Sequence, residues 1–275
     1  MTPTALTIAG SDSGGGAGIQ ADLKAFASLG VHGTSAITAI TAQSTVGVSA
    51  IHAVPAEMVL AQIRTVVSDI RVDAVKVGML GSEEVVMAVA QALDELPDGL
   101  PVVVDPVMVA ESGARLLEPS AQAALIGEIL PRASVLTPNL PEARVLLGGP
   151  ADAKGQGERD EDVERMAREI LALGPRAVVL TGGHRDSATD LLLGSEGGGV
   201  AVLIEGPRHR DGAAHGSGCT HSSALAAALA LGQELEQAAR TARRVAGDAV
   251  AAGLRDVGAG AGPVDAIGLA CRRAT

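Results

Sequence analysis

The sequence predicts an α/β fold, in which helices cover both faces of a largely parallel central sheet and so form a three-layer α/β/α sandwich. Short apolar runs alternate with longer segments of helical spacing, and this alternation occurs at least five times in succession along the 275 residues. The apolar runs suit buried parallel strands, which need both sheet faces covered. No sequence repeat and no interdomain linker is evident, so residues 1–275 are expected to form a single domain.

The expected elements follow one another in chain order. Strands are expected at residues 4–9, within the apolar segment 34–45 with Gln43 just after the strand, and at 73–79, 101–104, 133–136 and 177–180, followed by a pair of strands at 190–193 and 200–204. Helices are expected at 19–29, 55–69, 81–96 and 119–130, from within 137–142, and at 161–173, 219–231 and 234–253. The polar, glycine-rich stretch 148–162 is expected to be a surface loop. Because the carboxyl ends of parallel strands share one edge of a sheet, the loops that follow them should meet there.

Composition excludes several classes of function. The formal net charge of −11 argues against a protein that binds a nucleic-acid backbone, and the single aromatic residue, Phe26, argues against a stacking platform for single strands. Only three lysines occur, so a bound nucleotide would need helix N-termini, a few local cations and a metal ion to balance its charge. Cys219 and Cys271 do not make a disulfide framework, and no long uncharged apolar run is present. A cytoplasmic location is therefore expected, with no nucleic-acid or membrane partner.

The stretch from 212 to 232 is the central candidate site of the sequence, and the other motifs are interpreted in relation to it. A loop that contains two glycines, Gly216 and Gly218, runs into an alanine-rich helical segment, so the unpaired amides of a helix start should converge on one spot and attract an anion. Cys219 and Thr220 would lie in the first turn, where the pKa of a thiol is expected to fall toward neutrality. The alternative is a glycine turn with a side-chain cap beside an inert buried cysteine.

A second glycine-rich loop, residues 10–18, follows the first expected strand and precedes a helix. This order indicates a ligand site at the carboxyl end of the strand. A dinucleotide fingerprint that starts at Gly14 would need glycine where Ile19 stands, and no P-loop motif occurs. A plain glycine turn is the alternative.

Two polar residues near expected strands each allow two interpretations. Gln43 could offer its amide to a heterocycle or could be a solvated loop residue. Lys76 lies within an apolar run, where it is either an edge residue, which its position favours, or a buried functional cation.

Three polar side chains follow the next expected strands. Asp105 stands where a buried strand ends at a proline turn, a place where open parallel sheets hold catalytic and metal-binding groups, or it caps a helix. Asn139 and Glu142 are three residues apart, so they would share a helical face and direct an amide and a carboxylate toward one site. The same letters also predict a simple capping pair, and the local pattern favours that interpretation.

An ordered set of motifs extends through nearly the whole chain. The motifs are Ala5 to Lys24 with its Gly10-Ser11-Asp12-Ser13-Gly14-Gly15-Gly16-Ala17-Gly18 loop, Thr41-Ala42-Gln43, Lys76-Val77-Gly78-Met79-Leu80, Val104-Asp105-Pro106-Val107-Met108, Thr137-Pro138-Asn139-Leu140-Pro141-Glu142-Ala143, Gly182-Gly183-His184, His215-Gly216-Ser217-Gly218-Cys219-Thr220 and Gly260-Ala261-Gly262-Pro263-Val264. No single motif is decisive, but the ordered set is specific, and it closely resembles the hydroxymethylpyrimidine/phosphomethylpyrimidine kinases of thiamine biosynthesis, in the ribokinase-like superfamily.

The resemblance implies a ribokinase-like fold, a homodimer, and phosphorylation of 4-amino-5-hydroxymethyl-2-methylpyrimidine and then of its monophosphate, with ATP and Mg²⁺. It assigns pyrimidine binding to Gly10, Asp22, Gln43, Met79 and Val107. It assigns Mg²⁺ and phosphates to Asp105, Asn139 and Glu142, and the nucleotide to Thr181, Gly182, Gly183 and Thr220. It assigns the anion hole for the transferring phosphoryl group to the amides of Gly216, Ser217, Gly218 and Cys219, with the Cys219 thiol as the base that takes the hydroxyl proton in the first step.

Some positions depart from the family pattern. Thr181 and Ala259 stand where the family commonly has a cationic residue, which removes positive charge expected near the nucleotide or the transferred phosphate, and Arg208, Arg210 or Lys76 could compensate. Slower second phosphorylation would be one result. Two alternatives follow: a pyridoxal or pyridoxine kinase of the same superfamily, whose substrate is also a heteroaromatic alcohol, and a poorly catalytic relative that binds the pyrimidine.

Overall fold

The computed structural model describes residues 1–108, 117–150, 159–182, 188–195, 199–209 and 212–269, which contain a largely parallel sheet. Its eight strands lie in the order β10-β9-β8-β7-β6-β5-β1-β2. They are β1 (Thr4–Ala9), β2 (His32–Ile37), β5 (Ala74–Val77), β6 (Val102–Val104), β7 (Val135–Leu136), β8 (Ala177–Leu180), β9 (Asp190–Gly194) and β10 (Val202–Ile204). Each of the neighbouring strands β8, β7, β6, β5, β1 and β2 is parallel to the next in this order, whereas β9 is antiparallel to both β8 and β10. The predicted sheet is confirmed.

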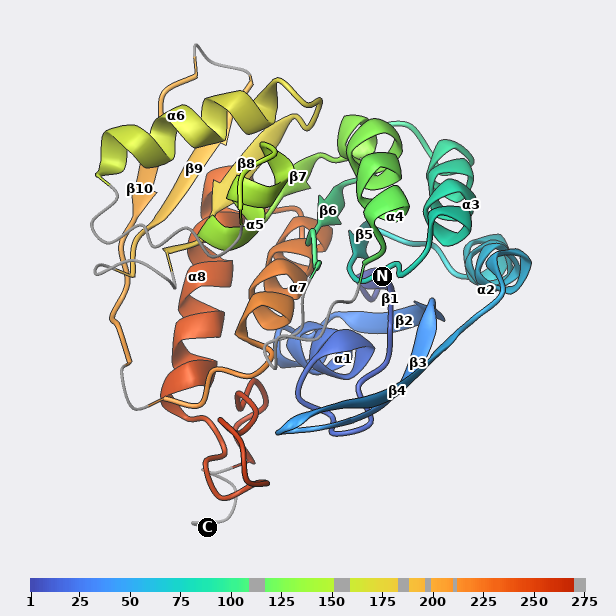
Figure 1. Ribbon diagram of the computed structural model, residues 1–275, viewed down its shortest axis with the longest axis horizontal. Coiled ribbons are helices and arrows are strands. Elements are labelled where there is room, and N and C mark those ends of the chain that lie inside the picture. Colours follow the sequence, from blue (N-terminus) through green and yellow to red (C-terminus); the bar gives the residue numbers. More distant parts are fainter. Residues whose placement is uncertain (109–116, 151–158, 183–187, 196–198, 210–211, 270–275) are drawn as a thin grey trace.

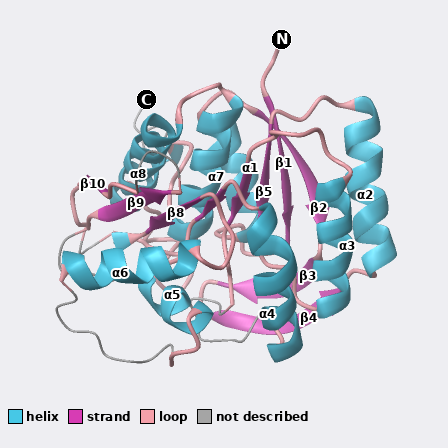
Figure 2. Ribbon diagram, turned by 90° about the horizontal axis from the view of Figure 1, so that it is seen from above, coloured by secondary structure: helices cyan, strands magenta, loops and turns pink. Residues whose placement is uncertain are grey.

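Helices cover both faces of the sheet and complete the three layers (Figure 1). One face carries α1 (Gly18–Ser28), α7 (Ser217–Ala230) and α8 (Leu235–Ala251), with α7 packed between the other two. The other face carries α2 (Ala56–Asp69), α3 (Glu83–Asp94), α4 (Pro119–Ala124), α5 (Leu140–Leu146) and α6 (Asp160–Leu171), as Figure 2 also shows. A π-helical turn (Leu125–Ile129) and a 3-10 turn (Leu130–Arg132) continue α4. Within the described ranges, no helix is both long enough and apolar enough to cross a membrane.

Alternation along the strands builds a hydrophobic core on each face. In β1, Leu6 and Ile8 are buried beneath the layer of α2 to α6, whereas Ala5 is buried beneath α1, α7 and α8. The single aromatic residue, Phe26, is fully buried in the second core. α7 has buried residues on all its sides, among them the run 224–228, because it lies between the sheet and two helices.

Residues 34–45 do not form the single strand that their apolar pattern predicts. β2 ends at Ile37, and the chain leaves the sheet at Thr38, whose N–H donates to the Ala9 carbonyl (3.1 Å) and whose hydroxyl donates to the Met79 carbonyl (2.6 Å). The next residues form β3 (Ala39–Ser44), which pairs with β4 (Gly47–Ala53) in an antiparallel hairpin outside the main sheet. The C-terminal segment packs on this hairpin, where the Gly260 N–H donates to Thr45 Oγ1 (3.2 Å). β-Branched residues suit either arrangement, so the strand pattern alone did not show the break.

The preference for Lys76 as an edge residue is wrong. β5 lies between β1 and β6 in the middle of the sheet, and Lys76 is 0% exposed. Its neighbours Val75 and Val77 belong to the core under α2 to α6, so Lys76 points to the opposite face. There its ammonium group donates to both carboxylate oxygens of Asp22 in α1, at 2.9 and 3.1 Å. This partner lies far away in the sequence, so the strand pattern could not show why a lysine can be buried.

Candidate active site

The carboxyl ends of the parallel strands bring several predicted site residues to one edge of the sheet. The glycine loop, residues 10–18, follows β1; Met79 follows β5, Asp105 follows β6 and Asn139 follows β7. α7 starts at the same edge, because Ser222 near its N-terminus donates its hydroxyl to Asp105 Oδ2 (2.9 Å). The expected meeting of these loops with the start of α7 is therefore present.

The anion loop, residues 215–219, forms the start of α7. Gly216 is the N-cap, with φ of 83°, and a Cβ atom there would lie 1.7 Å from the Gly16 carbonyl oxygen, so only glycine fits. The first intrahelical bond runs from Thr220 N–H to the Gly216 carbonyl (2.9 Å), and the Ser217 amide donates to the carbonyl of residue 214 (2.9 Å). The amides of Gly218 and of residue 219 precede that bond, and a Cβ atom at Gly218 would meet nothing within 4 Å. The space beside Gly218 is therefore open to an anion.

The glycine loop, in contrast, directs its amides toward a side chain of its own. Asp12 is 1% exposed; its Oδ1 accepts from the Gly14 amide (2.8 Å), and its Oδ2 accepts from the amides of Gly16 (2.9 Å) and Ala17 (2.8 Å). Burial by itself would raise the pKa of Asp12, but hydrogen bonds from His215 and from the amides of Ala17 and Gly14 lower it below its ordinary value. The carboxylate thus fills the nest of amides in which a phosphate could otherwise bind.

Cys219 is in the first turn of α7, as predicted, but its ionisation differs from the prediction. Its thiol is partly buried and accepts a hydrogen bond from the Gly18 amide. Burial raises the pKa of the thiol to about 12; Lys76 opposes this rise, whereas the carboxylates of Asp105 and Asp22 add to it. The expected fall of the pKa toward neutrality is therefore wrong, because desolvation and two nearby carboxylates outweigh the lowering effects of Lys76 and the Gly18 amide.

Asn139 and Glu142 form a capping box at the start of α5. Asn139 Oδ1 accepts from the Glu142 amide (2.9 Å), and Glu142 Oε2 accepts from the Asn139 amide (2.9 Å), which confirms the capping interpretation. Burial raises the pKa of Glu142 well above its ordinary value, and the charge of Asp105 adds to the rise. Burial also raises the pKa of Asp105, although Lys76 opposes it. The two carboxylates therefore share an environment that disfavours their negative charge.

This pair of carboxylates fits a magnesium ion that is also held by phosphate oxygens. No group of three or more His, Cys, Asp or Glu side chains in the described part of the chain is arranged to hold a metal ion. Mg²⁺, however, usually binds through one or two carboxylates together with water and substrate phosphates, and a cation would relieve the raised pKa of both acids. Asp105 and Glu142 suit this role, whereas Asn139 Oδ1 already serves the cap.

Asp22 lies beneath the site. It is 0% exposed; its Oδ2 accepts from the Thr7 hydroxyl (2.6 Å), its Oδ1 accepts from the Ser223 hydroxyl (2.7 Å), and both oxygens accept from Lys76. With both oxygens occupied, the arrangement suits a support for the site and does not favour a direct hydrogen bond to the pyrimidine.

Sequence reasoning missed the two serines that join α7 to these acids. Ser222 donates to Asp105 and Ser223 donates to Asp22, and both serines are 0% exposed. The available signal was a pair of serines directly before the alanine- and leucine-rich second half of α7.

The other residues assigned to the pyrimidine lie on the glycine loop, the β3–β4 hairpin and the loops after β5 and β6. A Cβ atom at Gly10 would lie 2.3 Å from the terminal methyl group of Met79, so these two residues are in contact. The backbone of Gln43 is fixed to the glycine loop by Ser13, whose hydroxyl accepts from the Gln43 amide (2.7 Å) and donates to its carbonyl (2.8 Å). Val107 follows β6 and is partly exposed. Contact of these side chains with a pyrimidine stays a prediction.

Two residues assigned to the nucleotide are fixed by their backbones. The Thr181 amide donates to the Pro138 carbonyl (2.9 Å), which places Thr181 beside the start of α5. The Gly182 amide donates to Asp190 Oδ1 (2.8 Å), and a Cβ atom at Gly182 would lie 2.2 Å from the Thr189 carbonyl oxygen. Glycine is therefore required at 182 by the close approach of the backbone that directly precedes β9.

The other two residues assigned to the nucleotide are Thr220 and Gly183. Thr220 is 0% exposed, and within the described ranges its hydroxyl has no hydrogen-bond partner. This buried hydroxyl faces protein atoms, and its contact with a nucleotide stays a prediction. Gly183 lies outside the described residues.

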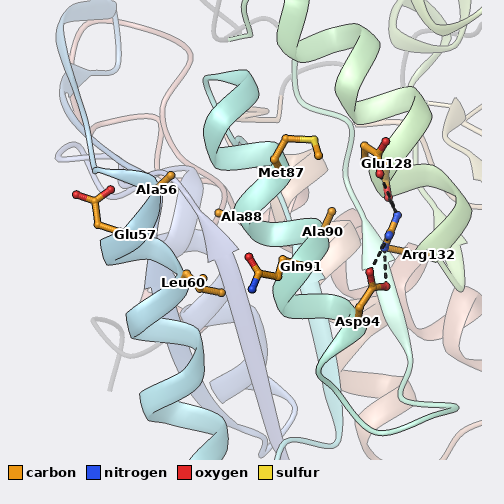
Figure 3. Close-up of a pocket in the computed structure, with 10 residues that line it drawn as sticks. All are labelled: Ala56, Glu57, Leu60, Met87, Ala88, Ala90, Gln91, Asp94, Glu128 and Arg132. Carbon is orange, nitrogen blue, oxygen red and sulfur yellow. Dashed lines mark hydrogen bonds and ion pairs between the residues drawn. The ribbon is translucent and has the colours of Figure 1, made fainter.

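A groove of about 520 Å³ lies away from this edge, between α2, α3 and the turns that follow α4 (Figure 3). Leu60 and Met87 line it, and Arg132 closes one side through an ion pair with Asp94 (2.7 Å). It contains none of the residues assigned to catalysis, so we place the candidate site at the sheet edge.

Known kinases are similar to this chain in sequence and in fold. The phosphomethylpyrimidine kinase family model matches residues 12–265. The hydroxymethylpyrimidine/phosphomethylpyrimidine kinase of Rhizobium meliloti is 49% identical over 96% of this chain and 97% of its own. The structure of phosphomethylpyrimidine kinase from Clostridium difficile is similar with a TM-score of 0.74 and 40% identity, over 88% of this chain and 96% of that one. A Bacillus subtilis pyridoxal kinase, solved as an ADP complex, has a TM-score of 0.83 and 34% identity, over 98% and 100% of the chains. This chain therefore belongs to the phosphomethylpyrimidine kinase family and has the ribokinase-like fold.

Proposed function

We propose that this protein transfers the γ-phosphoryl group of ATP to 4-amino-5-hydroxymethyl-2-methylpyrimidine and then to its monophosphate, in the biosynthesis of thiamine diphosphate. The observation that carries this proposal is the junction of two features at one sheet edge: the open helix start at Gly218 and the acids Asp105, which is buried, and Glu142, which is partly buried. Phosphoryl transfer requires chiefly alignment and charge neutralisation. An anion site beside a cation site supplies both.

The residues divide this work. The amides of Gly218 and Cys219 would hold the transferring phosphoryl group at the positive end of α7. Asp105 and Glu142 would hold Mg²⁺, which neutralises phosphate charge when it is bound. Ser222 fixes the Asp105 carboxylate through its hydroxyl, at 2.9 Å, and thereby sets the distance between the acid and the helix start.

The products formed from ATP, Mg²⁺ and the pyrimidine alcohol test the substrate. We expect the monophosphate to form first and the diphosphate to follow, both resolved by anion-exchange chromatography and identified by mass. Pyridoxal in a parallel reaction is the control, because pyridoxal kinases share the fold. Monophosphate without diphosphate would limit the activity to the first step, and phosphorylation of pyridoxal alone would contradict the proposed substrate.

We also propose that Cys219 takes the hydroxyl proton in the first step, and pH tests this role. The pKa of its thiol is about 12 in the ligand-free protein. Below that value the thiolate fraction rises about tenfold per pH unit, so the rate of the alcohol step should rise between about pH 6 and 9 without a plateau. Cys219→Ala should remove this pH dependence and slow the alcohol step about 100-fold or more. The monophosphate acceptor is already an anion, so its step should change little; equal losses in both steps would refute this division.

Glu142→Gln separates capping from metal binding. Glutamine keeps an oxygen that can accept from the Asn139 amide, so the capping box and the melting temperature should be retained, while the negative charge is lost. We expect the Mg²⁺ concentration for half-maximal rate to rise about tenfold or more at fixed ATP. Glu142→Ala, the matched control, should lower both the melting temperature and the Mg²⁺ affinity. An unchanged Mg²⁺ dependence in Glu142→Gln would leave the carboxylate with the capping role alone.

We further propose a homodimer formed through the β3–β4 hairpin. The hairpin exposes Ile40 (53%) on one face and Ile51 (47%) on the other, with Val46 (64%) at its turn, and a face that gathers exposed apolar side chains is typical of an interaction surface. Ile40 also lies on a hairpin face with the exposed Ala42 and Ala50. Sedimentation velocity should give about twice the chain mass of 27.4 kDa, and Ile40→Glu should shift the protein to the monomer. A monomer at all concentrations would contradict the proposal.

A cytoplasmic location stays a prediction.

A further inference from the structure

We propose that Asp12 and His215 are positioning residues, which hold the anion loop against the glycine loop and so fix the place of the α7 amides during phosphoryl transfer. His215 Nε2 lies 3.1 Å from Asp12 Oδ2, and the two side chains are 11% and 1% exposed. The contact joins segments from opposite ends of the chain. This inference rests on the proposed kinase function.

Asp12 is a fixed point and not a mobile surface acid. Three backbone amides of its own loop, those of Gly14, Gly16 and Ala17, donate to its two oxygens at 2.8 to 2.9 Å. Hydrogen bonds to an ionised acceptor are stronger than those between neutral groups, so the carboxylate and the glycine loop hold each other in place. A group that donates to Asp12 is thereby tied to the whole loop.

His215 connects this fixed point to the anion loop. It directly precedes Gly216, the N-cap of α7. Its carbonyl accepts from the Val264 amide (3.1 Å), and its ring lies so close to Gly16 that a Cβ atom there would be 2.3 Å from Cδ2. The ring thus has a carboxylate on one side and backbone on another, and its main chain is tied to the C-terminal segment.

Two further contacts make the relation between the loops specific. The Gly216 backbone approaches the Gly16 carbonyl so closely that no side chain fits between them, and the Gly18 amide donates to the Cys219 thiol. The loops are therefore in register at three successive places along the anion loop. A displacement of about 1 Å at reacting groups can lower a rate by about 100-fold, so the register matters for the chemical step.

The position of the pair predicts which kinetic constant depends on it. Removal of the His215 imidazole leaves Asp12 and its three amide bonds intact, so the glycine loop keeps its shape. The residues assigned to the pyrimidine, Gly10, Asp22, Gln43, Met79 and Val107, all lie outside the anion loop, so the KM for the pyrimidine should stay unchanged. The anion loop loses its side-chain link, so kcat should fall.

Two variants of His215 test this expectation. His215→Met keeps the bulk of the side chain without a hydrogen-bond donor, and we expect kcat to fall about 10-fold to 100-fold with the pyrimidine KM within about twofold of the parent. His215→Gln places an amide N–H near the position of Nε2, and we expect it to recover kcat to within about threefold of the parent. The double variant Asp12→Asn with His215→Met should be about as slow as the slower single variant, because both substitutions remove the same contact between the two side chains.

Other results would overturn the proposal. They are a His215→Gln enzyme as slow as His215→Met, a raised KM with unchanged kcat, or losses that multiply in the double variant. Thermal melting of each variant shows whether it is folded; if Asp12→Asn is not, the comparison of methionine with glutamine decides, since both keep Asp12. A parent protein without kinase activity would refute the proposed function instead. Urea unfolding of the parent, Asp12→Asn, His215→Met and the double variant would then test the contact. Additive losses in the free energy of unfolding would refute it.

Discussion

The buried contact between Lys76 and Asp22 is the constraint on which the arrangement of the site depends. Burial by itself would lower the pKa of Lys76, but the carboxylates of Asp22 and Asp105 raise it above its ordinary value, so the ammonium group stays charged inside the protein. A buried charge is stable only where its partners are held in place. Here Thr7 of β1 and Ser223 of α7 complete the coordination of Asp22. The network therefore fixes α1, α7 and the two central strands β1 and β5 relative to one another directly below the start of α7.

The chain uses the chemistry of a glycine-rich helix start twice, with opposite results. Before α1, the amides of the glycine loop converge on Asp12, so the anion that they bind belongs to the protein. Before α7, no acidic side chain precedes the helix within the anion loop, and the side of Gly218 stays open. An internal carboxylate in the first loop gives a rigid wall, and an unfilled second loop gives a place for phosphate. The two loops can then act as one unit, because the acid that closes the first also contacts His215 of the second.

Local pattern predicted the fold well, because strand and helix periods depend on nearby residues. The parallel strands, their helices and the capping box of Asn139 and Glu142 are all of this kind. The errors arose where a distant partner decides. The strand break at Thr38 depends on the Met79 carbonyl, and the high pKa of Cys219 depends on burial and on acids from other elements. In the capping box, Glu142 Oε2 accepts from the Asn139 amide, so the proposed metal role of this side chain would belong to its other carboxylate oxygen.

The distribution of positive charge sets a final condition on the mechanism. Thr181 and Ala259 are neutral where the family resemblance suggests cations, and Lys76 cannot replace them, because it is 0% exposed and its ammonium group is bound to Asp22. Arg208 is exposed, and Arg210 lies outside the described residues. In the proposed mechanism, neutralisation of phosphate charge would therefore fall mainly on the amides of α7 and on a metal ion at Asp105 and Glu142. Amides at a helix start act only over a short range, so the catalytic power of this site depends on how accurately the start of α7 is held.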